Sequence, residues 1–520
     1  MARHQTLLFC PTLDECIDDN HPVRHLDEIL QGMDWSAWTM EYNGRVGQPP
    51  IAPWVMASLV LWGMMRRIRS SRHLEYACAH YLDFMWLTER RSIDHDTICT
   101  FRAKFKEPLK QLFKQVGRVA MTMGLVKLVE VAFDGTRVKA NASRFHTWTA
   151  EKVEAALKEL EAKVEQMLEE LDKADAADAV LVGDGESRNL PPELADARKR
   201  QEKLRETLRK LREAEAARKK DGIDPKKNPA QLPKADEDPK VMPNKEGGYA
   251  PNYTPVAAPD SAYGIILDCD VIGGPNEQNE LLPSLDRIQE NFGRNPDKMS
   301  ADGAFGTGPN LEGTEKRGVD FYTPVESSSP QAGNPARRED PQQPVAEKDW
   351  PNLPRNEKKK LAKSCFVYDE AADVYYCPMG KAMPFEERKK EERSSGTVSM
   401  RVYRCHACDG CPLAGECLDP TAKRGRTVRR DGYEPLRDKM HAKLETEEGR
   451  TTYNRRMHIG ETPFAIIKGI MEVRRFLLRG LEKVRTEWMW VCTAYNLKKM
   501  IAVWAALRAE DEKMAVGMRN

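Results

Sequence analysis

The 520-residue sequence contains no long apolar run. No stretch approaches the roughly 20 uninterrupted apolar residues that a membrane-spanning helix needs, so we expect no membrane association. The opening MARHQTLLFCPTLDEC also lacks the long apolar segment of a signal peptide. These two absences argue against a membrane or secreted protein and favour a cytoplasmic location.

The chain also has almost no net charge. Its formal charge is +1, although 31% of its residues are charged. The charges are segregated, however: Lys and Arg outnumber Asp and Glu over residues 423–499, whereas residues 151–184 are acidic. A local basic surface on a neutral chain is compatible with a polyanionic partner.

The residue patterns divide the chain into several parts. Residues 1–125 read as an N-terminal helical domain, and its interleaved arginines could form either a solvated face or phosphate contacts that would suit DNA binding. Heptad-spaced apolar residues predict an antiparallel coiled-coil hairpin over 150–221. Residues 222–247 are Pro- and Lys-rich and read as a linker.

An alternation of strands and helices predicts an α/β (α+β) core from residues 126–149 and 248–325. The segment NYTPVAAPDSAYGIILDCDVIGG reads as two strands with a tight connection, and NEQNELLPSLDRIQENFG reads as a helix. Further strands are expected at KMSAD and VDFYTPV, with a short helix between them. The pattern predicts a mixed sheet with helices, followed by a Cys-rich, basic insertion over 326–450 and C-terminal helices over 451–510.

Three acidic residues stand where a rigid carboxylate site could form. The strand VEVAFD ends on Asp134, KMSAD ends on Asp302, and Glu461 lies in YNRRMHIGETPFAIIK. Simpler explanations exist, because Asp134 and Asp302 precede glycines and could be turn residues, and Glu461 could favour a helix start. Asp268 and Asp270, in LDCDV, are rivals for the second acid, ranked lower because they lie within a strand.

Four segments together resemble bacterial insertion-sequence transposases of the DDE class. They are SIDHDTICTFR, FDGTRVKANAS, ADGAFG and YNRRMHIGETPFAIIK, in that order behind a helical region. The resemblance covers about residues 22–500. It implies an RNase H-like catalytic domain in which Asp134, Asp302 and Glu461 hold Mg²⁺ or Mn²⁺ through hard oxygen ligands.

The last of these segments is similar to a family motif whose residues match here in order: Tyr453, Arg456, Glu461 and Lys468. Arg456 and Glu461 are one residue further apart than is usual. Glu461 and Lys468 lie two helical turns apart, so Lys468 is expected to share a face with Glu461 and to contact DNA phosphate. Arg456, Tyr453 and Arg137 are expected DNA-binding residues as well. Because proline suits only the first turn of a helix, Pro463 predicts that this helix begins at or just before Glu461.

The resemblance implies a transposase, an enzyme that cleaves its element's ends and joins the freed 3′-hydroxyl to target DNA. It implies double-stranded DNA (terminal inverted repeats and target) as the partner, a homo-oligomer in the DNA complex, and a bacterial, nucleoid-associated place of action. Two alternatives are an RNase H-like nuclease without strand transfer and a catalytically inactive, transposase-derived DNA-binding protein.

Five of the twelve cysteines lie between Cys377 and Cys417. The segment CHACDGCPLAGEC supplies four of them: Cys405, Cys408, Cys411 and Cys417. Thiolates two residues apart on a tight turn can share a tetrahedral Zn²⁺, which favours a structural zinc site with Cys377 or His406 as a substitute ligand. Unligated cysteines and an iron–sulfur cluster are the alternatives, although Pro412 and the late fourth cysteine depart from a ferredoxin pattern. The adjacent KRGRTVRR suggests that this insertion contacts DNA phosphates.

Overall fold

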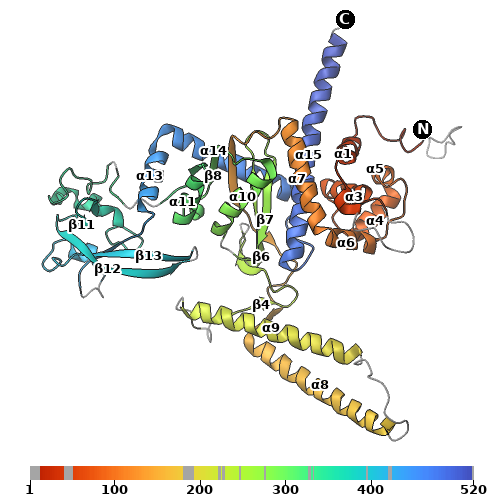
Figure 1. Cartoon of the computed structure of the whole chain (residues 1–520), viewed down its shortest axis with the longest axis horizontal. Helices are drawn as coiled ribbons and strands as arrows, with labels where there is room; N and C mark the ends of the chain where they lie inside the picture. The colour runs from red at the N-terminus through yellow and green to blue at the C-terminus, as the bar shows by residue number, and fades with distance from the viewer. Residues whose placement is uncertain are drawn as a thin grey trace.

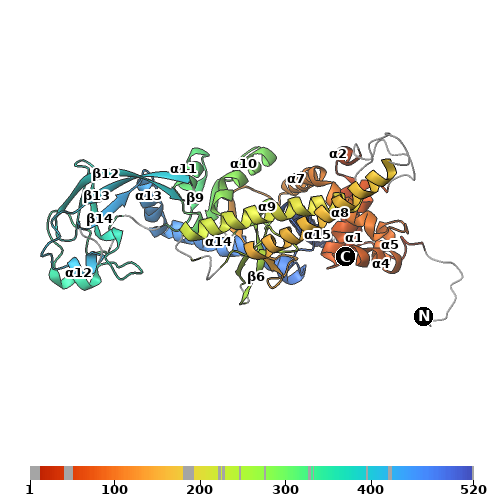
Figure 2. The same ribbon diagram turned by 90° about the horizontal axis from the view of Figure 1, so that it is seen from below.

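A computed structural model describes residues 12–39, 51–179, 192–220, 224, 229–244, 247–274, 277–325, 329–331, 333–393, 396–419 and 424–517. A central sheet lies between a group of N-terminal helices and a lobe built on a second sheet (Figure 1). Seen from below, these two parts occupy opposite ends of the molecule's long axis (Figure 2). Helix and strand are mixed throughout, which confirms the expected α/β class.

The N-terminal helices pack on the long C-terminal helix α15 (Leu481–Gly517). Their bounds are α1 (Pro22–Gln31), α2 (Ser36–Thr39), α3 (Pro53–Met65), α4 (Ser71–His80), α5 (Leu82–Leu87), α6 (His95–Lys104) and α7 (Lys106–Thr122). The Trp38 ring lies 5.4 Å from that of Phe101 and 6.0 Å from that of Trp490 in α15. Through α15, the helices and the central sheet share one continuous hydrophobic core.

Some of the interleaved arginines are structural. Arg69 pairs with the buried carboxylate of Glu487 in α15 at 2.6 Å. Arg102 is itself buried, and its guanidinium donates to the Arg69 carbonyl at 2.8 Å. These two cations fasten the N-terminal helices to α15 and are not a solvated face.

The central sheet has the strand order β7-β6-β1-β8-β9. Its strands are β1 (Glu130–Gly135), β6 (Tyr249–Pro259), β7 (Ile266–Ile272), β8 (Lys298–Ala301) and β9 (Asp320–Tyr322). Strand β6 runs antiparallel to β1 and β7, whereas β1, β8 and β9 are parallel to one another. Helices α10 (Leu281–Phe292) and α11 (Gly308–Lys316) connect these strands, as the alternating pattern predicted.

A pair of long helices projects from the body below the sheet (Figure 1). Helices α8 (Ala150–Ala179) and α9 (Pro192–Lys220) run antiparallel, since Glu161 of α8 accepts from Arg205 and Glu154 accepts from Arg212. The described part of the expected linker is more ordered than predicted. Strand β4 (Leu232–Pro233) pairs with β3 (Thr147–Trp148), and β5 (Lys240–Pro243) pairs with β6, which also pairs with β2 (Val138–Lys139).

The Cys-rich region forms a lobe with a separate hydrophobic core. Its sheet has the order β10-β11-β12-β13-β14. The bounds are β10 (Val367–Asp369), β11 (Val374–Tyr376), β12 (Ala382–Arg393), β13 (Gly396–Arg404) and β14 (Thr427–Arg430), with the short helix α12 (Ala414–Cys417) before β14. Helices α13 (Glu434–Glu445) and α14 (Glu447–Ala465) then return the chain to the central sheet.

The predicted start of the helix that carries Glu461 is wrong. Helix α14 begins at Glu447, where the Thr446 hydroxyl accepts from the Gly449 N–H at 3.0 Å, and Pro463 lies inside the helix. Proline removes one N–H from the helical ladder. The helix nevertheless continues through it, because Ile459, Pro463 and Phe464 are buried where α14 meets the sheet. A π-helical turn, η5 (Ile466–Ile470), follows directly.

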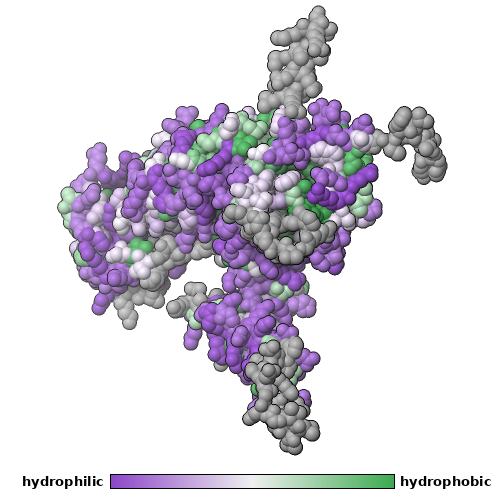
Figure 3. Space-filling view, turned by 45° about the vertical axis from the view of Figure 1, so that its right-hand side comes forward, coloured by the Kyte–Doolittle hydropathy of each residue, from purple (hydrophilic) through white to green (hydrophobic). Residues whose placement is uncertain are grey.

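No described helix combines the length and apolar character needed to cross a bilayer. On the face drawn in Figure 3, hydrophilic residues predominate and apolar ones are scattered in small groups.

Candidate active site

Asp134 and Asp302 lie side by side at one end of the central sheet. Strands β1 and β8 are parallel neighbours, and their register pairs Phe133 with Ala301. The residue that follows each of these is an aspartate, so the two carboxylates stand at adjacent carboxyl ends. This is the edge of a parallel sheet at which ligands bind.

Both aspartates also make the local turn contacts that their glycine neighbours suggested. The Asp302 carboxylate accepts from the Ala304 N–H at 2.8 Å, and Asp134 accepts from the Gly135 N–H at 2.9 Å. The Asp302 carbonyl accepts a hydrogen bond from the Thr323 hydroxyl at 2.7 Å. This contact holds the turn after β8 against the residue that follows β9. The turn role and a position at the sheet edge therefore coexist in the same residues.

Helix α14 brings Glu461 to these aspartates. The helix packs on β1 and β8 with Gly460 toward the sheet, where a Cβ atom would lie 3.3 Å from the Cβ of Asp134. Gly460 thus permits the close approach, and Glu461 is the next residue in the helix. Glu461 is exposed, while Asp134 is 9% exposed.

The charges of the three acids are coupled. Burial above all raises the pKa of Asp134 to about 6; the Gly135 N–H and the Arg456 cation oppose this rise, and the negative charges of Asp302 and Glu461 add smaller contributions to it. Mutual repulsion of this kind is relieved when a cation binds between the carboxylates.

A fourth acid, Glu277, belongs to the same group and was missed from the sequence. Its carboxylate lies against Gly135, where a Cβ atom would stand 1.6 Å from Oε2. Oε2 is buried and has no hydrogen-bond partner among the described residues. Burial and the charges of Asp302 and Asp134 raise the pKa of Glu277 to about 7, while Arg137 opposes them. We call Asp134, Asp302, Glu461 and Glu277 the acid cluster.

Asn310 holds two turns of the acid cluster together. Its side-chain amide donates to the Gln278 carbonyl at 2.8 Å and to the Phe305 carbonyl at 3.1 Å. Gln278 follows Glu277, and Phe305 ends the turn that begins after Asp302. Because Asn310 is itself buried in α11, it fixes the position of Glu277 relative to Asp302.

The expected DNA-binding residues surround the acid cluster and are engaged within the chain. Lys468 donates to the Thr136 hydroxyl at 2.6 Å and to the Arg137 carbonyl at 2.7 Å. Arg137 donates to the Pro243 carbonyl at 2.7 Å. Arg456 lies 4.0 Å from the Asp134 carboxylate, with its guanidinium 5.5 Å from the Tyr453 ring. Because η5 interrupts the α-helix after Ala465, Lys468 does not follow Glu461 in regular α-helical register.

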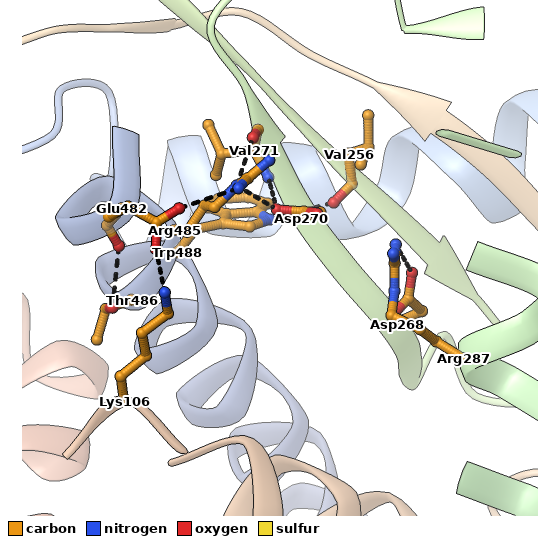
Figure 4. Close-up of polar contacts among 10 residues, drawn as sticks. All are labelled: Lys106, Val256, Asp268, Asp270, Val271, Arg287, Glu482, Arg485, Thr486 and Trp488. Carbon is orange, nitrogen blue, oxygen red and sulfur yellow. Dashed lines mark hydrogen bonds and ion pairs between the residues drawn. The ribbon is translucent and has the colours of Figure 1, made fainter. Parts of the chain in front are cut away.

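The two rival acids serve the packing of β7 (Figure 4). Asp268 accepts two hydrogen bonds from Arg287, both at 2.8 Å. Asp270 forms an ion pair with Arg485 at 2.9 Å, and Arg485 also forms an ion pair with Glu482. Both carboxylates lie on β7, across the sheet from β9, and each is paired with an arginine of a neighbouring helix, Arg287 of α10 or Arg485 of α15.

Five of the six cysteines of the Cys-rich lobe surround one small cavity of about 20 Å³, and the sixth, Cys365, is buried elsewhere in the core of the lobe. Cys377 follows β11, Cys405 and Cys408 follow β13, Cys411 lies in the next turn, and Cys417 ends α12. His406, a substitute ligand considered from the sequence, is exposed and does not line the cavity. The structure therefore brings Cys377 to the four sequence-local cysteines.

Within the described residues, no three His, Cys, Asp or Glu side chains are already arranged to hold a metal ion. The acid cluster and the cysteine cavity offer different kinds of metal ligand. The acid cluster offers hard carboxylate oxygens, including the unpartnered Oε2 of Glu277, which suit Mg²⁺ or Mn²⁺. The cysteine cavity offers soft thiolates, which suit Zn²⁺.

Two parts of the chain match family models. Residues 376–501 match a transposase DDE domain, and residues 11–104 match a transposase domain (DUF772). Over these two segments the chain is similar to transposases, and over residues 376–501 to those of the DDE type. None of the curated proteins compared with the chain matches it.

The two matched segments include only part of the predicted site. The DDE match contains Glu461, Lys468 and the cysteine cavity, whereas Asp134 and Asp302 precede it in the chain. The roles of these two aspartates are therefore argued from their position beside α14.

Proposed function

We propose that the chain is a DNA transposase that uses Asp134, Asp302 and Glu461 to cleave the ends of its element and to transfer the freed strands. One observation carries the proposal: two strand-end aspartates and the α14 glutamate converge within a chain that matches transposase domains. In the order β7-β6-β1-β8-β9, β6 is antiparallel to the other four strands, which fits the RNase H-like fold that the resemblance implies.

The reaction would proceed by two direct displacements at phosphorus. Water attacks the phosphodiester at the element end, the bond to the 3′ oxygen breaks, and a 3′-hydroxyl is released. That hydroxyl then attacks a phosphodiester of target DNA, so one P–O bond forms as another breaks and no protein intermediate arises. Divalent ions held by the carboxylates would activate the attacking oxygen and stabilise the leaving one.

The surrounding cations suit the charge that develops on the phosphate. Arg456 lies beside Asp134, and Lys468 reaches the loop that follows β1. Lys468 could exchange the Thr136 hydroxyl and the Arg137 carbonyl for a phosphate oxygen when DNA enters, because the charge-assisted contact is stronger than one to a neutral oxygen. For Arg456, a phosphate would compete with the Asp134 carboxylate.

A cleft beside the Asp302 turn offers a path for DNA. It has a volume of about 910 Å³ and runs between Gly303–Gly308 and the Cys-rich lobe, where Lys363, Arg426 and Arg429 line it. Lys363 pairs with Glu434 and Arg429 with Glu391, so phosphates would compete with these carboxylates there. The projecting α8–α9 hairpin would be available for contacts between protomers in a DNA complex.

The test uses DNA from either side of the gene, which would carry the terminal repeats. Purified full-length chain with Mg²⁺ should cut labelled flanking DNA at one position and then join the cut end to a target plasmid. Asp134→Asn should bind the same DNA with unchanged affinity and leave it uncut. Cleavage without joining would point to a nuclease, and binding without cleavage by the wild type would point to an inactive DNA-binding protein; either result overturns the proposal.

A further inference from the structure

The cysteine cavity joins segments that are distant in sequence. Cys377 comes from the end of β11, whereas the other four cysteines lie between β13 and the end of α12. The lobe's own hydrophobic core is small and includes Cys377, Cys405 and Cys417 as buried members. A metal ion bound by these cysteines would add a cross-link to a lobe whose own core is small.

Backbone groups are arranged around two of these sulfur atoms as they are around metal-bound thiolates. The Lys381 N–H donates to Cys377 Sγ at 3.4 Å, and the Arg426 N–H donates to Cys408 Sγ at 3.5 Å. The second contact requires Gly425, whose φ is +88° and where a Cβ atom would lie 2.1 Å from the Cys405 carbonyl oxygen. Outer contacts of this kind orient ligands before a metal binds.

Two arginines flank the cavity and would offset the negative charge of several thiolates. Arg338 donates to the carbonyls of Cys377 at 3.1 Å and Pro378 at 2.7 Å. Arg426 donates to the Cys417 carbonyl at 2.9 Å. Both guanidinium groups are therefore held beside the cysteine residues by hydrogen bonds to backbone carbonyls.

The five cysteines are not equivalent. Cys377, Cys405 and Cys417 are buried, and Cys408 receives the Arg426 N–H. Cys408 and Cys411 are both half-buried, and the Cys411 backbone N–H shapes the turn by donating to the Cys408 carbonyl at 3.2 Å. A cavity of about 20 Å³ has room for a single ion and not for a multi-iron cluster.

We propose that Cys377, Cys405, Cys408 and Cys417 bind one Zn²⁺ as a tetrathiolate, with Cys411 outside the ligand set. This replaces one member of the quartet expected from the sequence, Cys411, with a residue from a different strand. Binding draws the four sulfur atoms from their present positions to about 2.3 Å from the ion. The ion then ties β11 to the segment that leads through β14 into the helices carrying Glu461. The assignment does not rest on the proposed function.

Metal content of the full-length protein tests the ligand set. After dialysis against metal-free buffer, the wild type and Cys411→Ser should each retain about one zinc per chain by elemental analysis. Cys377→Ser should retain less than about a third of that amount under the same treatment. Absence of zinc from the wild type, or a full equivalent in Cys377→Ser with loss in Cys411→Ser, overturns the proposal.

A second measurement on the wild type avoids variants that fail to fold. Alkylation with iodoacetamide followed by peptide mapping should find Cys411 modified and the other four protected in the zinc-loaded protein. Treatment with a chelator should expose those four to alkylation. Replacement of zinc by Co²⁺ should give the intense visible bands of four-thiolate tetrahedral coordination. Protection of Cys411 together with modification of Cys377 would contradict the assignment, as would iron and sulfide in the purified protein.

Discussion

Gly460 of α14 faces Asp134 of β1 so closely that a Cβ atom at position 460 would lie 3.3 Å from the Asp134 Cβ and 3.5 Å from its Oδ2. A glycine inside a helix usually lowers stability relative to alanine by roughly 0.5–1 kcal/mol. Here the missing side chain lets the helix that carries Glu461 approach the strand that carries Asp134. The spacing of the candidate carboxylates therefore depends on one absent methyl group.

Gly460→Ala should lower DNA cleavage several-fold, because the Asp134 side chain must move by a few tenths of an ångström and a shift of about 1 Å between reacting groups can cost about a hundredfold in rate. Thermal stability should change little, since the gain in helix propensity offsets the tighter contact. Single-turnover cleavage and a melting curve measure the two effects. Gly469→Ala is the matched control, because nothing lies within 4 Å of a Cβ atom there. Equal activity in the two variants would show that the close approach is unimportant for catalysis.

Glu277→Gln should raise the Mg²⁺ concentration needed for half-maximal cleavage by about tenfold, the scale on which groups around a metal site tune its affinity. The substitution keeps the shape of a side chain that fits against Gly135 while it removes a negative charge next to Asp302 and Asp134. A titration of cleavage rate against Mg²⁺ gives the result. Glu290→Gln, on the exposed side of α10, is the control. An unchanged Mg²⁺ dependence would exclude Glu277 from the metal site.

The raised pKa of Asp134 makes ionisation of this group unfavourable in the folded state. The value rises from 3.8 to about 6, so the unfolded chain loses the proton first as the pH increases. The stabilising effect of the protonated carboxyl is complete below about pH 4 and is lost as the pH passes about 6. Asp134→Asn should remove this dependence.

For the metal-free protein, we expect the stability advantage of Asp134→Asn over wild type to grow by about 2 kcal/mol between about pH 4.5 and about pH 8. Denaturant unfolding in the presence of a chelator measures it. Asp96→Asn, at a carboxylate that is 88% exposed, should show no such growth. Added Mg²⁺ should recover the lost stability of the wild type at the higher pH, because an ion that binds the folded state stabilises it. A constant difference between wild type and Asp134→Asn across the pH range would contradict the prediction.

Asp268→Asn should destabilise the protein without touching the chemistry. Asp268 is buried and forms a two-point contact with Arg287, so its loss leaves a partly buried cation unpaired. We expect the free energy of unfolding to fall by about 2 kcal/mol, with cleavage per folded molecule unchanged. Asp286→Asn breaks the same kind of two-point contact, with Arg317, at an exposed carboxylate and should cost less than about 1 kcal/mol. Loss of cleavage by folded Asp268→Asn would restore this residue as a candidate for the second acid.

Lys468→Gln tests whether Lys468 contacts a DNA phosphate or only residues of its own chain. If Lys468 exchanges Thr136 and the Arg137 carbonyl for a DNA phosphate, the substitution should weaken DNA binding and lower its salt dependence by about one unit of slope. Binding measured over a range of salt concentrations gives the slope. Lys483→Gln, in the first turn of α15, is the control. An unaltered slope with reduced cleavage would show that Lys468 only positions the loop after β1.

Local sequence was sufficient for several features of the fold and the candidate site. Apolar alternation that stops at Asp134, and a second strand that stops at Asp302, predicted two carboxylates at strand ends. The register of β1 and β8 makes these neighbours. The strands and helices between Tyr249 and Tyr322 also lie where the pattern placed them, because alternation and turn residues are short-range signals.

Other features required the tertiary structure because they arise between segments distant in the chain. Glu277 joins the acid cluster because Gly135 leaves room for it. Cys377 joins the cysteine cavity because the turn after β11 and the segment after β13 line the same cavity. Pro463 gave a misleading helix boundary, since the local cost of a missing N–H was outweighed by burial of the helix against the sheet. The sequence by itself determined which residue types stand at the ends of which strands. Packing and register decided which of those charges and thiols meet, because burial and repulsion depend on distances in space and not along the chain.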